Sequence, residues 1–228
     1  MSQEQHDIRE VLGQTRARIQ ARVERHARER HGDAFLGIAR SCYPGRGLAG
    51  AGRAALFLSW ALFRWRPLPM ERKLARARGV KLPDGPVALE WLGEMGDGLD
   101  ALTADYVRLA CAAPFAFVKV TGFAQGGVLL EDMLTARALP VMPMAEGGRG
   151  LARADVLFGQ AVSLEGFTLF THPPLAVLEK GAGGRRLKGI LDMLARELEE
   201  AQGRGENRQR LADNLLFLQA GLLISGAR

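Results

Sequence analysis

Five short β-rich runs, all between residues 114 and 171, constrain the fold of this chain more than any other feature. They are rich in aromatic and β-branched residues and are separated by glycine-containing turns, a pattern typical of antiparallel strands. Five strands in so short a segment predict a small antiparallel β-barrel or a strongly bent sheet. Pro140 cannot donate a ladder hydrogen bond, so we expect it at an edge, a strand start or a bulge. The runs are 115–120, 127–132, 139–142, 155–162 and 167–170.

The segments on both sides of these runs have helical periodicity. In residues 4–31, Ile8, Leu12, Ile19 and Val23 recur on one helix face. After residue 185, an amphipathic helix is predicted at 186–201, and a last helix at about 206–224. Thr103 is expected to cap the helix that leads into the first strand. The sequence therefore predicts an α+β protein with helical N- and C-terminal regions around the β module. The main change in composition, near residue 81, predicts a basic helical region at 1–80 and an acidic β module with flanking helices at 81–228.

Part of the β-rich region resembles a module found in bacterial proteins. The residues concerned are Gly-Val-Leu-Leu-Glu-Asp-Met-Leu-Thr-Ala-Arg-Ala-Leu-Pro-Val at 127–141 and Leu-Ala-Arg-Ala-Asp-Val-Leu-Phe-Gly-Gln-Ala-Val at 151–162. They are similar to the pattern L-x-D-L-L-T-G-x-x-x-x-V … L-x-x-G-D-x-L-x-A-R-V of a β module in poorly characterised bacterial proteins, often with a SEC-C zinc motif. The turn glycines of that pattern correspond to Ala136 and Ala154. The resemblance covers about a quarter of the chain and implies no established activity; without the SEC-C cysteine cluster, it implies no zinc.

Charge is distributed unevenly along the chain. The net charge is +6, but residues 1–80 hold 16 Lys and Arg against 7 Asp and Glu, a net of +9, whereas residues 81–180 have a net of −5. A basic region indicates nucleic acid, anionic lipid or an acidic protein as partner. The alternatives for the basic helix faces are a solvated surface, balanced by Glu24 and Glu29, or a docking face for another protein. The candidate polyanion-binding residues are Arg18, Arg22, Arg25, Arg72, Lys73 and Arg76.

The most apolar stretch is 54–63, within a longer segment from Leu48 to Trp65. Ten apolar residues are too few to span a bilayer, which needs about 20. A buried core helix is one interpretation. The alternatives are a helix at a membrane interface, with arginines against the headgroups, or a hydrophobic partner surface. In both alternatives the contacting side chains would be Phe57, Trp60, Phe63 and Trp65.

The sequence predicts no catalytic residue, no metal site and no cofactor. His26 and His31 are five positions apart and are therefore expected on different helix faces, and there is no HExxH pattern. Cys111 lies in an apolar helix, where a cysteine is expected to be a small buried residue. An enzyme of unknown reaction is an alternative only if an acidic cleft forms from Asp97, Asp100, Asp105, Glu131 and Asp132.

The function predicted from these features is a non-catalytic binding or adaptor protein. Its basic N-terminal helices would contact nucleic acid or an acidic protein, and peripheral membrane association through residues 48–65 is an alternative. The C-terminal helix, at about 206–224, is apolar nearly all round and is expected to be buried, with a homodimer interface as the alternative. The polar, acidic N-terminus and the two cysteines predict a cytoplasmic protein without a signal peptide. The resemblance to the β module implies that the protein is bacterial.

Overall fold

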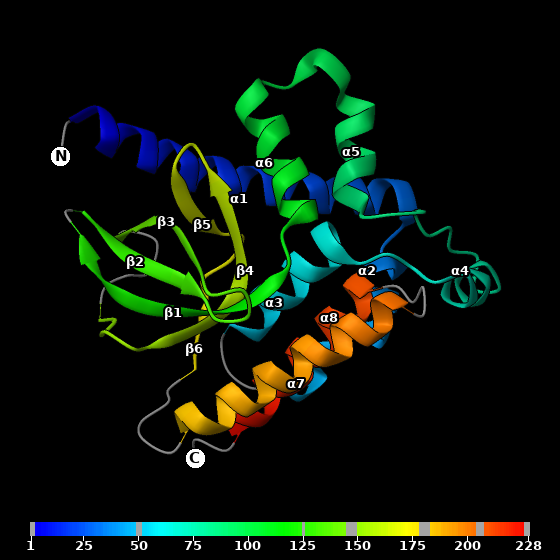
Figure 1. Cartoon of the computed structure of the whole chain (residues 1–228). Coiled ribbons are helices and arrows are strands. Elements are labelled where there is room, and N and C mark those ends of the chain that lie inside the picture. Colours follow the sequence, from blue (N-terminus) through cyan, green and yellow to red (C-terminus); the bar gives the residue numbers. More distant parts are fainter. Residues whose placement is uncertain are drawn as a thin grey trace. The chain divides into compact units, whose positions relative to one another are not determined.

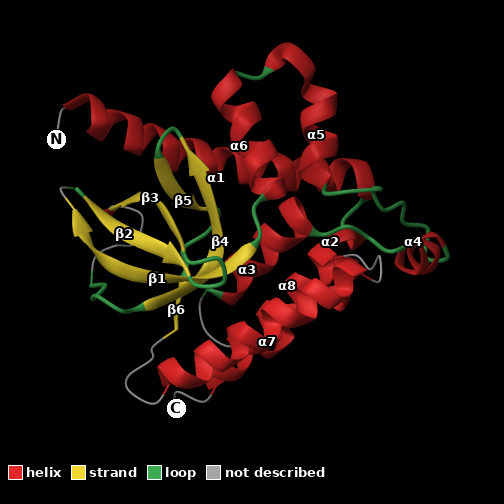
Figure 2. Cartoon of the chain, viewed as in Figure 1, coloured by secondary structure: helices red, strands yellow, loops and turns green. Residues whose placement is uncertain are grey.

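The computed structural model describes residues 3–48, 52–124, 126–144, 150–177, 183–203 and 208–225. Within these residues the chain forms eight α-helices and a five-stranded closed β-barrel with one additional strand (Figures 1 and 2). This confirms the predicted α+β class, with helices before and after a central β module. The chain divides into a helical unit, Met1–Tyr43 with Leu56–Ala113, and a barrel unit, Pro44–Ala55 with Pro114–Arg228.

The helical unit consists of one long helix and several short ones. Helix α3 begins in segment 44–55 of the barrel unit and continues into the helical unit from residue 56. A short π-helical turn, η2, continues α3 without interruption. The elements are α1 (Gln3–His31), α2 (Ala34–Cys42), α3 (Arg53–Ser59), η2 (Trp60–Arg64), α4 (Pro69–Arg76), α5 (Val87–Met95), η3 (Gly96–Gly98) and α6 (Ala101–Ala112).

Helix α1 buries a narrow apolar stripe. Ile19, Val23 and Ala27 are spaced four residues apart and are at most 3% exposed, and α1 contacts α2, α5 and η2. Side chains spaced by three or four residues share one face of a helix. The stripe therefore fixes which face of α1 turns inward and leaves the remaining faces to charged residues.

The aromatic stretch that ends in η2 lies in the core of the helical unit. Phe57, Trp60, Phe63 and Trp65 are between 1% and 4% exposed. Trp60 and Trp65 stack with ring centroids 5.8 Å apart, and Tyr43 packs against both Phe57 and Trp60. Full burial of a large apolar side chain contributes about 2 kcal/mol, so these residues stabilise the unit. These contacts agree with the interpretation of the segment as a buried core helix. The four side chains are therefore not part of the surface that the described residues form.

Helix α6 begins three residues earlier than the expected cap at Thr103 indicates. Asp100, rather than Thr103, is the N-cap: its carboxylate accepts hydrogen bonds from the Thr103 backbone N–H, at 2.8 Å, and from the Thr103 hydroxyl, at 2.7 Å. Asp is among the best N-cap residues because its side chain satisfies a free N–H of the first turn. These hydrogen bonds, backbone first, hold the pKa of Asp100 below its usual value.

The barrel unit contains the five predicted strands and a sixth that the sequence analysis missed. Strand β1 pairs with both β2 and β4, so the order β4-β1-β2-β3 forms a Greek key. Strand β5 pairs with β4 and meets β3 in parallel between Val141 and Phe167, which closes the barrel. The strands are β1 (Phe115–Ala124), β2 (Gly127–Asp132), β3 (Arg137–Pro143), β4 (Val156–Leu164), β5 (Phe167–Phe170) and β6 (Leu175–Val177).

Turn and bulge residues set the register of the barrel. In the β2–β3 ladder, Met142 pairs with Val128 and Leu139 with Leu130, so two β3 residues lie opposite one β2 residue. Pro140 lies in this bulge, as predicted. Glu165 and Gly166 join β4 to β5 with φ values of 49° and 75°, as a two-residue type I′ hairpin requires. The predicted turn at 147–150 lies outside the described residues except for Gly150.

The C-terminal helices α7 (Gly183–Gly203) and α8 (Arg208–Ser225) pack against each other, and α8 also packs against the short helix η1 (Pro44–Gly47). Phe217 of α8 lies with its ring centroid 4.6 Å from that of Phe115 and 5.2 Å from that of Phe158. Leu218, however, is 55% exposed. The prediction that α8 is buried on nearly all sides is therefore wrong at this position.

The division into units differs from the change in composition near residue 81. Helices α5 and α6 belong to the helical unit, while residues 44–55 belong to the barrel unit. Each unit is thus built from two separate stretches of chain. No helix within the described residues is long and apolar enough to cross a membrane.

Candidate functional site

Three of the predicted polyanion-binding arginines form an exposed row on α1. Arg18, Arg22 and Arg25 are spaced by four and three residues, so they project from one side of the helix. All three are exposed, whereas Ile19 and Val23 of the same turns are buried. Within the described residues, none of the three forms an ion pair. We call these three residues the basic row.

The arginines that follow in α1 are neutralised. Arg28 lies 2.9 Å from a carboxylate oxygen of Glu24 and 3.3 Å from one of Asp33. Arg30 lies within 4 Å of two glutamates of α5, Glu90 and Glu94. Among the described side chains of α1, the middle turns therefore present positive charge without an acidic partner.

The second predicted basic group, on α4, is only partly free. Arg72 forms a 2.6 Å ion pair with Asp84. Lys73 and Arg76 are exposed and form no ion pair among the residues that the structure describes. Helix α4 lies apart from the middle of α1 (Figure 1), so the structure shows two separate basic patches rather than one surface.

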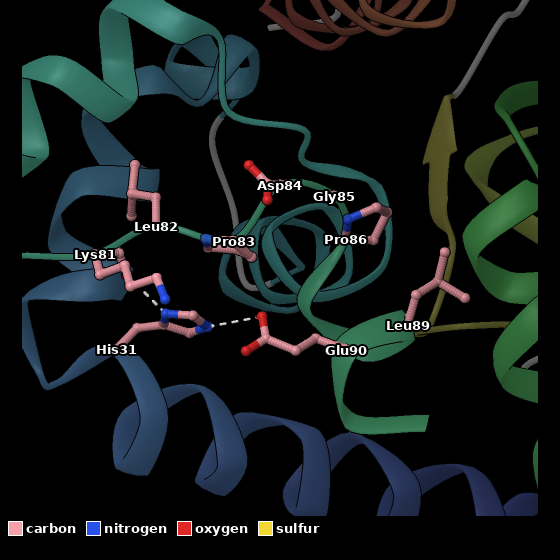
Figure 3. Close-up of a pocket in the computed structure, with 9 residues that line it drawn as sticks. All are labelled: His31, Lys81, Leu82, Pro83, Asp84, Gly85, Pro86, Leu89 and Glu90. Carbon is pink, nitrogen blue, oxygen red and sulfur yellow. Dashed lines mark hydrogen bonds and ion pairs between the residues drawn. The ribbon is translucent and has the colours of Figure 1, made fainter. Parts of the chain in front are cut away.

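A pocket of about 370 Å³ lies between the end of α1 and the start of α5 (Figure 3). It is lined by residues 81–86 together with His31, Leu89 and Glu90. The His31 side chain is only 3% exposed and stacks on Phe35, with centroids 5.4 Å apart. Its Nδ1 lies 2.7 Å from the Lys81 carbonyl oxygen, and its Nε2 lies 3.1 Å from Oε2 of Glu90. A carbonyl oxygen only accepts hydrogen bonds, so Nδ1 of His31 donates to Lys81, and Nε2 faces the Glu90 carboxylate.

Next to the pocket, Glu90 belongs to a cluster of charged side chains from two helices. Arg30 Nε lies 3.6 Å from Oε1 of Glu90 and 3.4 Å from Oε1 of Glu94. His26 Nδ1 lies 3.8 Å from Oε2 of Glu94. One ligand atom each from His26, Glu90 and Glu94 can be chosen so that all three lie within 4.8 Å of one another. We call His26, Arg30, His31, Glu90 and Glu94 the His–Glu cluster.

Sequence reasoning did not find this cluster. Five-residue spacing does place His26 and His31 on different sides of α1, but each meets a different glutamate of the same neighbouring helix. Glu90 and Glu94 are four residues apart and therefore share a face of α5. The four-residue spacing of the two glutamates was the one sequence feature that pointed to this cluster. Nothing in the sequence indicated that this face of α5 would pack beside α1.

The carboxylates proposed for an acidic cleft make local contacts. Asp100 caps α6, and Asp105 pairs with Arg108 at 2.8 Å in the same helix. Asp132 accepts hydrogen bonds from the backbone of Leu134 and Thr135 in the turn after β2. The side chain of Asp97 is outside the described residues. None of these carboxylates lines the pocket beside His31.

Cys111 is a core residue of the helical unit, as expected for a cysteine in an apolar helix. It is 3% exposed, and burial raises the pKa of its thiol to about 12, although the nearby charges of Arg66 and Arg64 oppose that shift. A thiol that stays protonated is a poor nucleophile and a poor metal ligand. Arg64, itself buried, donates a 3.2 Å hydrogen bond to the Ala112 carbonyl at the end of α6.

The sequence matches no protein-family model, and comparison with curated proteins and with solved structures gives no significant match.

Proposed function

We propose that the protein is a non-catalytic binding or adaptor protein of the bacterial cytoplasm that contacts the phosphate backbone of nucleic acid through the basic row of α1. The observation that carries this proposal is the difference in exposure and ion pairing among the arginines of α1. Arg18, Arg22 and Arg25 are exposed without an ion pair among the described residues, whereas Arg28 and Arg30 of the same helix are engaged by carboxylates.

The dimensions of the basic row suit a phosphate backbone. At a rise of 1.5 Å per residue, Arg18 and Arg25 are separated by about 10 Å along the helix axis. Long, flexible arginine side chains at this spacing reach successive phosphates of one strand, and guanidinium groups bind phosphate oxygens in pairs. Contacts of this kind position a protein on nucleic acid but do not read its sequence.

The barrel provides weaker support for nucleic-acid binding. Five-stranded Greek-key barrels include the OB-fold, whose β2–β3 face binds oligonucleotides, but fold alone does not establish function. In this chain Glu131 and Asp132 lie on β2, and Asp132 is paired in register with Arg137 of β3. This mixture of charges does not form a phosphate-binding surface, so the proposal places the contact on α1.

The resemblance to the bacterial β module is also part of the proposal. Ala136 and Ala154 occupy the positions where that module has turn glycines, and both have positive φ, 54° and 74°. A left-handed conformation at these positions favours the same turns as in the glycine-containing pattern. Cys42 and Cys111 are both free thiols, which suits the reducing cytoplasm.

The test is fluorescence anisotropy with single- and double-stranded oligonucleotides at about 50 and 200 mM salt. Three phosphate contacts predict a slope of about −2.7 in log K against log salt, or about a 40-fold loss of affinity over this range. The variant Arg18→Glu/Arg22→Glu/Arg25→Glu is expected to lose binding at both salt concentrations.

A matched control separates a specific row from net charge. The variant Arg137→Glu/Arg153→Glu/Arg196→Glu makes the same change in charge at exposed positions of the barrel unit and is expected to keep most of the affinity. Equal losses in the two variants would mean that only overall charge matters. Absence of binding at 50 mM salt would reject the nucleic-acid proposal and favour an acidic protein as partner.

A further inference from the structure

Three side chains of the His–Glu cluster present metal-ligand atoms to one point between α1 and α5. His26 offers an imidazole nitrogen, and Glu90 and Glu94 offer carboxylate oxygens, all within 4.8 Å of one another. Glu90 and Glu94 lie one helical turn apart, so both carboxylates can reach one ion. Two helices of the same compact unit therefore hold all three donors.

The contacts that these side chains make without an ion are long. The Arg30 guanidinium lies 3.4 and 3.6 Å from the two carboxylates, and the His26–Glu94 distance is 3.8 Å. Charge-assisted hydrogen bonds between such groups are normally about 2.7–2.9 Å long. In addition, Nε2 of His26 is buried and has no hydrogen-bond partner among the described residues. Among the polar atoms of this cluster, Nε2 of His26 is thus the one that is buried without a partner in the described part of the chain.

One member of the trio is already held in place by a neighbour. His31 bridges from the Lys81 carbonyl to Oε2 of Glu90, with distances of 2.7 and 3.1 Å, and its side chain is 3% exposed (Figure 3). Carboxylates that bind metals are usually fixed by hydrogen bonds of this type from residues that do not touch the ion. The neighbour therefore reduces the freedom that Glu90 would lose on binding an ion.

We infer that His26, Glu90 and Glu94 form a binding site for a divalent first-row transition metal, with Zn²⁺ as its probe. An imidazole with two carboxylates suits Zn²⁺ better than Mg²⁺ or Ca²⁺, which take oxygen ligands. Ligand atoms on a tetrahedral zinc are about 3.4 Å apart, so the side chains must close by about 1 Å. Glu94 and Arg30 are 46% and 59% exposed, which leaves room for that closure and for Arg30 to turn into solvent.

The experiment is isothermal titration of the metal-free full-length chain with ZnCl₂. We expect saturable binding of one ion per chain. His26→Ala and Glu94→Gln are each expected to weaken it by about tenfold or more, and MgCl₂ should give no comparable binding. Glu29→Gln removes an exposed carboxylate of α1 that forms no ion pair within the described residues, and it should leave the affinity unchanged.

Arg30→Gln distinguishes a metal site from a simple ion-pair cluster. Arg30 occupies the position of a competing cation between the two carboxylates, so its removal is expected to tighten Zn²⁺ binding. Circular dichroism checks the fold of each variant. If His26→Ala is unfolded, the Zn²⁺ affinity of Glu94→Gln, a substitution at an exposed position, decides whether the metal site exists. Absence of saturable binding, or equal affinities in the parent, Glu94→Gln and Glu29→Gln proteins, would overturn the inference.

Discussion

At the scale of single residues, the two cysteines are expected to differ sharply in reactivity. Burial raises the pKa of Cys111 to about 12, and only the thiolate attacks thiol reagents readily, whereas Cys42 is only half-buried. With Ellman's reagent we expect one thiol of the native protein to react readily and the second to react only after unfolding. Cys42→Ser should abolish the rapid phase, and Cys111→Ser should keep it. A rapid phase in Cys42→Ser would contradict this.

Asp100 should stabilise the helical unit in a pH-dependent way. Its folded pKa is lowered by the hydrogen bonds from Thr103, so its contribution is complete above its unfolded pKa of about 4 and is lost as the pH falls through the lower, folded value. Asp100→Ala is expected to reduce the free energy of unfolding by about 1 kcal/mol at pH 7. Urea unfolding at pH 7 and pH 3 measures this, and the loss should shrink at pH 3.

Asp105→Ala provides the matched control for Asp100→Ala. Asp105 forms only an exposed ion pair with Arg108 in the same helix, and such pairs contribute between about 0 and 1 kcal/mol. The two substitutions change the charge equally within five residues. If they had equal effects at pH 7, the cap would have no special contribution.

The residues that sequence reasoning placed correctly are those whose role is local. An Asp just before a strand is typical of a turn, and the carboxylate of Asp155 accepts a hydrogen bond from the Ala152 backbone at 2.7 Å. Pro140 and Cys111 also follow from rules about one backbone or one side chain. By contrast, the His31–Glu90 contact joins residues 59 positions apart. No local rule reports such a contact, so the candidate metal site became visible only from the packing of α5 beside α1.

At the scale of elements, the strands were predictable because glycine turns separate apolar runs clearly. Strand β6 was missed because it has only three residues and follows two prolines, so its pairing with β4 rather than its composition defines it. The segment 54–63 has a composition compatible with either a core or an interface. Only its neighbours, such as Tyr43 and Tyr106, decide for the core.

Glycine substitutions in two turns of the barrel unit are expected to raise its stability. Ala136 and Ala154 have φ values of 54° and 74°, which cost a residue with a Cβ about 1–2 kcal/mol. Ala136→Gly and Ala154→Gly should each raise the free energy of unfolding by about 0.5–1 kcal/mol, since the greater freedom of glycine in the unfolded chain offsets part of the gain. Urea unfolding measures the change.

Ala138→Gly serves as the control for these turn substitutions. Ala138 is an exposed residue of β3, paired with Glu131, and does not have a positive φ. Glycine there is expected to lower stability by about 0.5–1 kcal/mol. Stabilisation at all three positions, or at none, would mean that the sign of φ does not determine the effect.

At the scale of the whole molecule, charge is uneven along the sequence, but the two folded units have the same net charge. The helical unit contains 16 Lys and Arg against 13 Asp and Glu, and the barrel unit contains 15 against 12, so each has a net charge of +3. The acidic residues of 84–105 join the unit that also contains most of the basic residues. Sequence totals therefore overstated the basic character of the N-terminal region, and the basic row of α1 is what remains.

The stability of the barrel unit should depend on a segment that is far from its strands in the sequence. Residues 114–228 expressed alone lack 44–55, whose Leu48 is 1% exposed and whose Gly52 lies so close to Leu175 that a Cβ would overlap it. We expect this fragment to unfold at lower urea concentration than one in which 44–55 precedes it through a Gly/Ser linker. Equal midpoints would show that the segment contributes nothing to the unit.

The packing of α8 against η1 also has a consequence for the order of events on the ribosome. Residues 44–47 are synthesised well before the helix that packs against them, Arg208–Ser225. At bacterial or eukaryotic translation rates this delay is about 10–35 s. During that time η1 has no α8 to pack against. A nascent chain stalled before residue 208 should therefore bind chaperones through residues 44–55, and release should follow completion of α8.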